Sequence, residues 1–174
     1  MNDETLILRP VQMSDVPQVQ RLIDEIFQEY DCKLDALQED THLLAPGPYF
    51  RVHGGEFWVI ARGAEILATV AVKMLPPDAA ELKTLYVAKS LRRHGWGRKL
   101  SELVMDYARA RGRQRMILWS DTRFTDAHRL YEKLGFQATG EIRDLHDSNN
   151  SLEYGYTRRL SKQESAECKE LRTG

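Results

Sequence analysis

The sequence has few cysteines, no excess of either charge and no long apolar run. Its two cysteines, Cys32 and Cys168, lie far apart in 174 residues, so we expect no structural disulfide and a reducing compartment. The 25 Lys and Arg residues nearly balance the 26 Asp and Glu residues, and a net charge of -1 gives no reason to expect a nucleic-acid partner. No run could span a bilayer, and Asp3 and Glu4 stand where a secretory signal has basic residues. We therefore expect a cytoplasmic protein that binds neither nucleic acid nor membrane.

Motifs for metal binding and for a cysteine nucleophile are missing as well. The sequence contains no His-Glu-x-x-His and no Cys-x-x-Cys, and its histidines do not follow metal-ligand spacing. No Cys-His constellation can be read around Cys32. We therefore expect no metal site and no thiol chemistry. The histidines stand at positions 42, 53, 94, 128 and 146.

The hydrophobic pattern predicts a single α/β domain over residues 1–160, with a polar, disordered tail at 161–174. A hydrophobic fraction of 42% and a charged fraction of 29% are typical of a globular protein, and no repeat or second core is visible. Ser14 is expected to cap the first helix, with Pro17 in its first turn. The proline and glycine residues at 46–48 are expected to break a short helix before them. Strands are predicted at 5–9, 57–61, 66–72, 81–87, 116–119, 136–142 and 152–160, and helices at 16–27, 34–44, 98–111 and 127–134.

A glycine-containing turn joins the strand that ends at Val87 to the amphipathic helix that follows. Gly95 and Gly97 let the backbone approach a ligand and present successive N–H groups, and the helix start adds a partial positive charge. The turn therefore suits a phosphate or pyrophosphate, which Arg92, Arg93 and Arg98 would reinforce. The spacing is neither a dinucleotide fingerprint nor a Walker loop. From these residues alone, a simple strand-to-helix connection remains the alternative.

Two motifs carry a resemblance to a known family. Arg92-x-x-Gly95-x-Gly97, between a strand that contains Glu81 and an amphipathic helix, resembles the acetyl-CoA signature of the GNAT N-acetyltransferase family. The downstream segment Ala127-x-x-x-Tyr131-Glu132-Lys133-Leu134-Gly135-Phe136 resembles the helix and strand that follow the cofactor cleft in that family. The strand at 116–119 and the order of the elements also match, so that the resemblance covers residues 5–160.

The resemblance implies the GNAT fold, a mixed central sheet flanked by helices, with acetyl-CoA as co-substrate. It places the pantetheine arm where the strand ending at Val87 splays from its neighbour, and an N–H near Val87 against the thioester carbonyl. Many relatives carry Asn where this chain has Phe124, and Asp121 or Thr122 is the candidate substitute. The residues implied to bind acetyl-CoA are Leu85, Tyr86, Val87, Arg92, Arg93, His94, Gly95, Trp96, Gly97, Arg98 and Asp121.

Two residues match the catalytic positions of the family. Tyr131 falls on the usual tyrosine and is implied to donate a proton to the departing thiolate, although its helical spacing also suits a packing role. Glu81 resembles the glutamate that acts as general base in some members, either directly or through water. Its alternatives are substrate orientation and a plain surface charge.

The acceptor is expected to be the primary amine of a small molecule, which attacks directly in a ternary complex. Acidic and aromatic residues in the segment 28–55 would suit a cationic amine, and a solvated helix face is the alternative for them. A protein acetyltransferase and a non-catalytic CoA-binding module remain competing interpretations; an open peptide groove would indicate the former. The resemblance also allows a homodimer. The acidic and aromatic residues are Glu29, Tyr30, Asp31, Asp35, Glu39, Asp40, Tyr49 and Phe50, and Asp144, His146 and Asp147 of the last hairpin loop are expected near the entrance.

Overall fold

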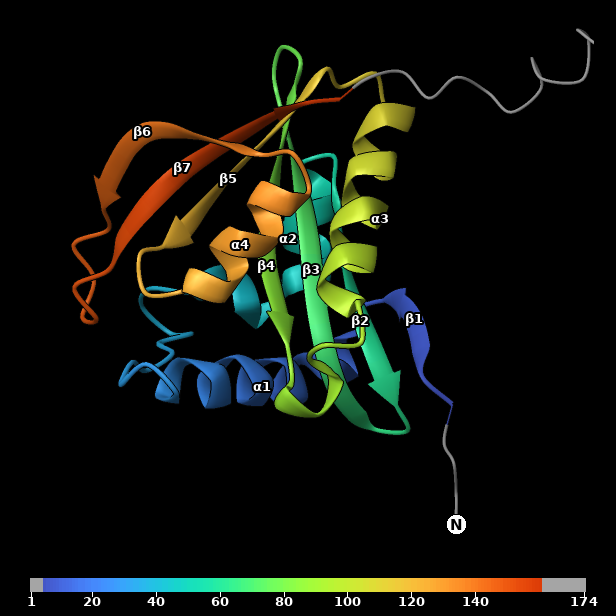
Figure 1. Ribbon diagram of the computed structural model, residues 1–174. Coiled ribbons are helices and arrows are strands. Elements are labelled where there is room, and N and C mark those ends of the chain that lie inside the picture. Colours follow the sequence, from blue (N-terminus) through green and yellow to red (C-terminus); the bar gives the residue numbers. More distant parts are fainter. Residues whose placement is uncertain (1–4, 161–174) are drawn as a thin grey trace, which may run out of the picture.

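A computed structural model describes residues 5–160, and the tail predicted at 161–174 lies outside this range. The chain forms a seven-stranded sheet in the order β1-β2-β3-β4-β5-β7-β6, with helices on both faces (Figure 1). Among the described residues, no helix is long and apolar enough to cross a bilayer. The elements are β1 Ile7–Pro10, α1 Val16–Gln28, α2 Pro46–Val52, β2 Glu56–Arg62, β3 Glu65–Leu75, β4 Ala79–Val87, α3 Trp96–Ala110, β5 Arg115–Asp121, α4 Thr125–Lys133, β6 Gln137–Asp144 and β7 Leu152–Arg159.

The mixed α/β architecture predicted from the sequence is confirmed, and every predicted strand is present with bounds shifted by a few residues. All neighbouring strands pair in antiparallel fashion except β4 and β5, which are parallel. The predicted hairpin is formed by β2 and β3 around a turn at Gly63, where φ is 57°. The three helices expected at 16–27, 98–111 and 127–134 correspond to α1, α3 and α4.

Alternation along the strands divides the apolar side chains between the two faces of the sheet. On one face, Val70 of β3 packs in a cluster with Leu100 of α3 and Tyr131 of α4. On the other face, β2 and β3 pack in a second cluster with Ile23 of α1 and Phe50 of α2. We call these surfaces the α3 face and the α1 face. Each side chain of β4 or β5 therefore projects from either the α3 face or the α1 face.

The predicted start of the first helix was wrong. Ser14 lies inside the 3-10 turn Met13–Asp15, and Asp15 rather than Ser14 precedes α1. Arg9 of β1 donates to both carboxylate oxygens of Asp15, at 2.7 and 2.9 Å, and the backbone N–H of Gln12 donates to the same carboxylate at 2.8 Å. This carboxylate contact between β1 and the turn therefore decides where α1 begins.

The helix predicted at 34–44 was also wrong. Residues 36–39 form turns and Thr41–Leu44 forms a 3-10 helix, whereas the α-helix begins at Pro46. The Asp35 carboxylate accepts hydrogen bonds from the N–H groups of Leu37 and Gln38 at 3.1 and 2.9 Å, and such local bonding competes with a helix. Proline is favourable in the first helical turn, where no N–H partner is needed. The proline expected to break a helix therefore begins one.

Candidate active site

The strands β4 and β5 diverge soon after they meet. They pair only at Ala79–Arg115, Ala80–Met116 and Glu81–Ile117, while β5 continues along β7 to Asp121. In Figure 1, β5 turns away from β4, so that the arrowheads of the two strands lie apart. From residue 82 onward, the edge of β4 that faces β5 has no strand partner among the described residues. Its backbone groups are therefore available to a ligand, as they are at any exposed sheet edge.

A bulge in β4 changes the direction of this edge. The register with β3 shifts between the pairs Thr69–Tyr86 and Ala71–Lys83, and Thr84 adopts a positive φ of 49°. The Thr69 hydroxyl donates to the Thr84 carbonyl at 2.7 Å, but the Thr84 hydroxyl is buried without a partner among the described residues. A β-branched residue in this region of φ is strained, and such strain is concentrated at functional sites. Sequence reasoning missed Thr84, because threonine in a strand carries no signal for a left-handed conformation.

The turn before α3 presents a row of free N–H groups. Arg93 and Gly95 have positive φ values of 64° and 80°, and the first helical bond runs from the Lys99 N–H to the Gly95 carbonyl at 3.0 Å. The amides of Trp96, Gly97 and Arg98 therefore stand in the unpaired first turn of the helix. A Cβ atom at Gly95 would meet nothing within 4 Å, so glycine is needed there for its backbone conformation and not for space. This arrangement can bind an anion through the backbone alone.

Gly97 has a second role, because α3 and α4 approach each other closely at this point. A Cβ atom at Gly97 would lie 2.9 Å from Cδ2 of Leu130 in α4. The Gly97 carbonyl accepts a hydrogen bond from the buried Ser101 hydroxyl at 2.8 Å. The absence of a side chain therefore lets α4 sit beside the start of α3.

The basic residues predicted for the turn differ in their surroundings. Arg92 is bound to Glu29, directly after α1, through two hydrogen bonds of 2.9 Å, and its Nε donates to the Val87 carbonyl at 3.0 Å. This contact raises the pKa of Arg92 and lowers that of Glu29, so both stay charged. Arg93 and His94 are exposed. Arg92 thus ties α1 to the end of β4, while the exposed positions remain free for a ligand.

Trp96 and Arg98 lie at the outer side of the same helix start. The Trp96 ring has the Lys99 ammonium 4.6 Å from its centroid. Arg98 is exposed and lies 3.7 Å from the Glu102 carboxylate, a spacing that makes only a weak surface pair. Leu85 and Val87 pack toward the α3 face, and Tyr86 packs toward the α1 face against Phe27. The structure therefore brings residues 85–87 and 93–98 together at one end of the opening between β4 and β5.

Asp121 lies at the end of β5 and is committed to the following turn. Its Oδ1 accepts hydrogen bonds from the N–H and the Nε of Arg123, at 2.8 and 3.0 Å. Its carbonyl oxygen lies 3.0 Å from Nε2 of His128 in α4. Phe124 packs its ring 4.8 Å from that of Tyr30 and 6.5 Å from that of Tyr86. The Asp121 carboxylate therefore holds the turn that follows β5, and the Phe124 ring fills the space between this turn and β4.

Tyr131 and Glu81 lie on opposite faces of the sheet. Tyr131 is 5% exposed and belongs to the α3-face cluster, with its ring 5.8 Å from Phe136 and 6.0 Å from Tyr156. Burial raises the pKa of Tyr131 above its usual value, so the phenol keeps its proton. Its hydroxyl makes no hydrogen bond to a described residue, but it is not completely inaccessible to solvent. The Tyr131 phenol therefore keeps its proton within the α3-face cluster.

Glu81 points to the α1 face, because its neighbours Ala80 and Leu82 belong to the α3-face cluster. Its side chain is 12% exposed, and its Oε1 lies 3.3 Å from the Lys83 ammonium. Glu81 is the last residue of β4 that pairs with β5, so it stands where the two strands begin to part. The Glu81 carboxylate and the Tyr131 phenol therefore lie on opposite faces of the sheet, and Glu81 stands where β4 and β5 part.

Loop contacts close one side of the α1 face. The backbone N–H and the hydroxyl of Ser148, between β6 and β7, donate to the Glu39 carboxylate at 2.8 and 2.9 Å. Asn149 exchanges two hydrogen bonds with the backbone of Lys33, at 3.0 and 2.8 Å. Arg123 donates to the Asn149 carbonyl at 3.0 Å and to the Cys32 sulfur. We call these contacts the loop bridge; sequence reasoning missed it, since its partners lie about a hundred residues apart.

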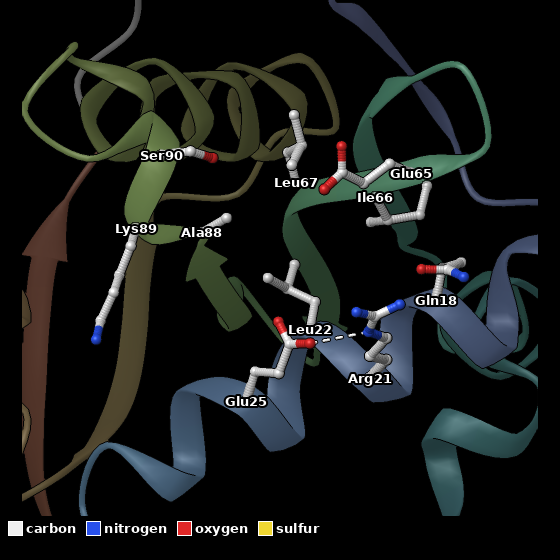
Figure 2. A pocket seen from close by; sticks show the side chains of 10 residues that line it. All are labelled: Gln18, Arg21, Leu22, Glu25, Glu65, Ile66, Leu67, Ala88, Lys89 and Ser90. Atoms are coloured by element: carbon white, nitrogen blue, oxygen red, sulfur yellow. Dashed lines mark hydrogen bonds and ion pairs between the residues drawn. The ribbon is translucent and has the colours of Figure 1, made fainter.

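The shallow hollow shown in Figure 2 is a different place. It measures about 230 Å³ and lies between α1, the start of β3 and residues 88–90. None of the ten residues that line it is a predicted cofactor or catalytic residue. No group of three His, Cys, Asp or Glu side chains suited to a metal occurs among residues 5–160. The candidate site therefore follows from the divergence of β4 and β5 and not from an enclosed cavity.

Comparison with known proteins agrees with this geometry. The sequence model of the Acetyltransferase (GNAT) family matches residues 17–136. The uncharacterized N-acetyltransferase YjgM of Escherichia coli K12 is 26% identical over 136 residues, which cover 75% of this chain and 81% of YjgM. N-acetyltransferase 8 of Mus musculus is 33% identical over 98 residues, which cover 53% of this chain and 43% of the mouse protein. The chain thus spans most of the bacterial relative and less than half of the mouse one.

Solved structures show the same fold. A GNAT-family acetyltransferase from Staphylococcus aureus Mu50 superimposes with a TM-score of 0.79 at 20% identity, covering 90% of this chain and all of the other. YncA from Salmonella typhimurium, solved with its cofactor acetyl-CoA, superimposes with a TM-score of 0.67 at 17% identity, covering 92% of this chain and 96% of YncA. At these identities the likeness concerns the fold alone.

Proposed function

The chain belongs to the GNAT family of acetyltransferases, and on that premise we propose that it transfers an acetyl group from acetyl-CoA to the primary amine of a small molecule. The observation that carries the proposal is the opening between β4 and β5, which has free amides at one end and a protonated phenol and a carboxylate on its two faces. A non-catalytic CoA-binding module would not need ionizable groups on both faces. The arrangement therefore favours an enzyme in which the amine attacks directly.

The described residues fit acetyl-CoA as co-substrate. The unpaired edge of β4 at 85–87 would hold the pantetheine arm, and the amides at 93–98 would hold the pyrophosphate. The buried, unpartnered hydroxyl of Thr84 beside this edge is a polar group that the protein alone leaves unsatisfied. When bound, acetyl-CoA supplies the activated acetyl thioester.

The two catalytic candidates, Glu81 and Tyr131, are proposed to accept and to donate a proton. We assign to the Glu81 carboxylate the acceptance of a proton from the incoming amine, directly or through one water molecule. We assign to the Tyr131 phenol the donation of a proton to the departing sulfur; burial raises its pKa, so the phenol is protonated before the reaction. A backbone N–H near Val87 would stabilise the charge that develops on the carbonyl oxygen.

The loop bridge supports a small acceptor over a protein. A peptide substrate needs an open groove, whereas contacts from Ser148, Asn149 and Arg123 join the last hairpin to the segment after α1 and close that side. Cys32 is buried as a free thiol, and burial raises its pKa, which is consistent with a reducing compartment. We therefore propose a cytoplasmic enzyme that acts on a small amine.

The direct test is a calorimetric titration of the full chain with acetyl-CoA, CoA and ATP in turn. We expect binding of acetyl-CoA and CoA and no heat with ATP, since ATP has phosphates but no pantetheine arm for β4. Release of free thiol in the presence of an amine panel then tests transfer. If neither CoA form binds, the cofactor assignment is wrong; if both bind and no amine releases thiol, the assignment as an amine acetyltransferase is wrong.

A further inference from the structure

Two lysines share the α1 face with Glu81. In the pairing of β3 with β4, Lys73 stands directly opposite Glu81, and Ala71 stands opposite Lys83. Because alternate residues point the same way, Lys73, Glu81 and Lys83 all project from one face of the sheet. Both lysine side chains are only partly exposed. The carboxylate proposed as the base is therefore flanked by two cations.

The negative charge near these lysines is insufficient to balance them. Glu81 forms an ion pair with Lys83 at 3.3 Å, but Lys73 lies within 4.0 Å of no carboxylate of the described residues. The contact recorded for the Lys73 ammonium is with the Tyr49 ring, 5.7 Å from its centroid. One ammonium group beside the proposed base therefore lacks a counter-ion.

A histidine facing the same lysines adds no compensating negative charge. His42 packs 5.7 Å from the Tyr49 ring and 6.1 Å from the Phe50 ring. Its burial, followed by the charges of Lys83 and Lys73, lowers its pKa to about 4. His42 is therefore neutral at physiological pH, and the surface formed by Lys73, Lys83, Glu81 and His42 carries an excess of one positive charge.

Four of the acidic residues expected to attract a cationic amine are engaged elsewhere. Glu29 binds Arg92, Glu39 accepts hydrogen bonds from Ser148, and Asp35 accepts them within its own turn. In the last hairpin loop, the Asp147 carboxylate accepts a hydrogen bond from the backbone of Ser151 at 2.8 Å. These carboxylates hold loops together and are not free for a substrate.

We propose that the acceptor amine carries a carboxylate, which Lys73 and Lys83 bind while the amine nitrogen faces Glu81. This inference rests on the proposed function. In the transfer, the neutral acceptor nitrogen forms a bond to the acetyl carbon as the carbon–sulfur bond of acetyl-CoA breaks; Glu81 takes a proton from nitrogen, and Tyr131 gives its proton to the sulfur, which leaves as the thiol of CoA.

The register places these charged residues close enough to contact one small molecule. Opposed residues on antiparallel strands have Cβ atoms roughly 5 Å apart, and residues two apart on one strand are separated by about 7 Å. An amine and a carboxylate in one small molecule, such as an amino acid, can span this separation. A simple alkylamine would leave the lysines without an anion, and a polyamine would be repelled by them.

The test compares matched acceptors in a thiol-release assay. Amino acids are each paired with their carboxamide, which keeps the amine and the shape but removes the negative charge, and plain alkylamines complete the panel. We expect kcat/KM to be about 10- to 100-fold higher for the carboxylates, as charge-assisted hydrogen bonds suggest. Equal or better turnover of the carboxamides or alkylamines would overturn the inference.

Substitutions in the protein separate the acceptor contact from the chemistry. Lys73→Met and Lys83→Met keep the apolar stem and should raise KM for the carboxylate acceptor by about tenfold or more, with little effect on its carboxamide. Glu81→Gln should instead lower kcat for every acceptor. Lys133→Met, at an exposed position at the end of α4, is the matched control. If both lysine variants slow carboxylates and carboxamides equally, the lysines serve Glu81 and the inference is wrong.

Calorimetry with acetyl-CoA on the same protein samples shows whether a negative result contradicts the proposed function or only the carboxylate preference. The lysine variants should bind acetyl-CoA as the unmodified chain does, because residues 85–87 and 93–98 are unchanged. If the unmodified chain does not bind acetyl-CoA, the proposed function itself is wrong. Normal binding and turnover without carboxylate preference would overturn only this inference.

Discussion

The two sides of the opening are built on different principles. The cofactor side consists of residues 84–98 with α4, and it offers backbone groups from one continuous stretch of chain. The acceptor side consists of residues 29–52 and 145–151 with Lys73, Glu81 and Lys83, and it offers side chains from four separate segments. Backbone groups recognise the same ligand whatever the side chains are, whereas a set of side chains can change with the acceptor. The comparison suggests a constant cofactor site beside a variable acceptor site.

The charges of the two sides differ as well. On the cofactor side, the partly exposed Arg92 is neutralised by Glu29, and the turn depends on the exposed amides before α3. On the acceptor side, Lys73 has no carboxylate partner among the described residues. On our proposal, the cofactor side would bind an anion mainly through dipoles, and the acceptor side would bind one through full charges. Changes confined to one side should leave the other side intact.

The largest effect should come from Gly97→Glu on the cofactor side. The new side chain would collide with Leu130 and place a negative charge beside the free amides, so acetyl-CoA affinity should fall by about 100-fold or more. Calorimetric titration measures it. Gly97→Ala, which adds a methyl group without charge, is the control for crowding, and thermal unfolding checks that both variants fold. A folded Gly97→Glu protein with unchanged affinity would show that the pyrophosphate does not bind at this turn.

Tyr131→Phe should have the next largest effect, on turnover. Loss of the retained proton should lower kcat by about 100-fold while acetyl-CoA affinity changes little, since the ring still packs against Phe136 and Tyr156. Steady-state kinetics and calorimetry on the same sample separate the two quantities. Tyr107→Phe, on α3 against Trp58, is the matched control. Full turnover in the Tyr131 variant would reduce this residue to a packing role.

Arg123→Met tests whether the acceptor side can be opened alone. The substitution removes hydrogen bonds to Asn149 and Asp121 from a partly exposed side chain, so unfolding should become easier by about 1 kcal/mol. KM for the acceptor should rise by about fivefold, the equivalent of that energy. Hydrogen exchange should increase at 145–151 and not at 93–98. Arg129→Met, an exposed position on α4, is the control, and equal exchange at both segments would contradict independent sides.

The smallest effect concerns pH and two groups of the acceptor side. Burial raises the pKa of Asp40 to about 6, so its contribution to stability is present below its unfolded value and is lost as pH rises through 6. Burial lowers the pKa of His42 to about 4, so its contribution is present above its unfolded value and is lost as pH falls through 4. Between pH 4 and 6, Asp40 lowers and His42 raises the stability as pH increases. These two effects largely cancel, so together they should change the stability of the unmodified chain little in this range.

Single substitutions should expose each slope. In Asp40→Asn, the free energy of unfolding should rise between pH 4 and 6.5 because His42 acts alone; in His42→Phe, it should fall over pH 4 to 6. Both groups are partly solvated, so each change should amount to about 1 kcal/mol. Urea unfolding at several pH values measures it. Slopes of the same sign in both variants would show that other groups control this pH range.

The elements of the cofactor side were predictable because their signals are local, whereas the binding roles of their residues stay predictions. The glycines at 95 and 97, the amphipathic helix after them and the motif around Tyr131 all lie within short stretches, and the free amides follow from a helix start. The bulge at Thr84 was not predictable, because its positive φ is imposed by pairing with β3 and by the hydrogen bond from Thr69. The acceptor side was interpreted wrongly at 34–44, where turn chemistry at Asp35 overrides the apolar spacing.

The sequence by itself determined the family, the order of the elements and the anion-binding turn, because each depends on residues that are neighbours along the chain. Only the tertiary structure decided which charges face the acceptor. The loop bridge joins residues up to 116 positions apart, and the lysine pair exists because the register of β3 with β4 sets Lys73 opposite Glu81. The physical reason is that a side chain is free or engaged according to its partners in space, and no local pattern records whether Glu29 has already met Arg92.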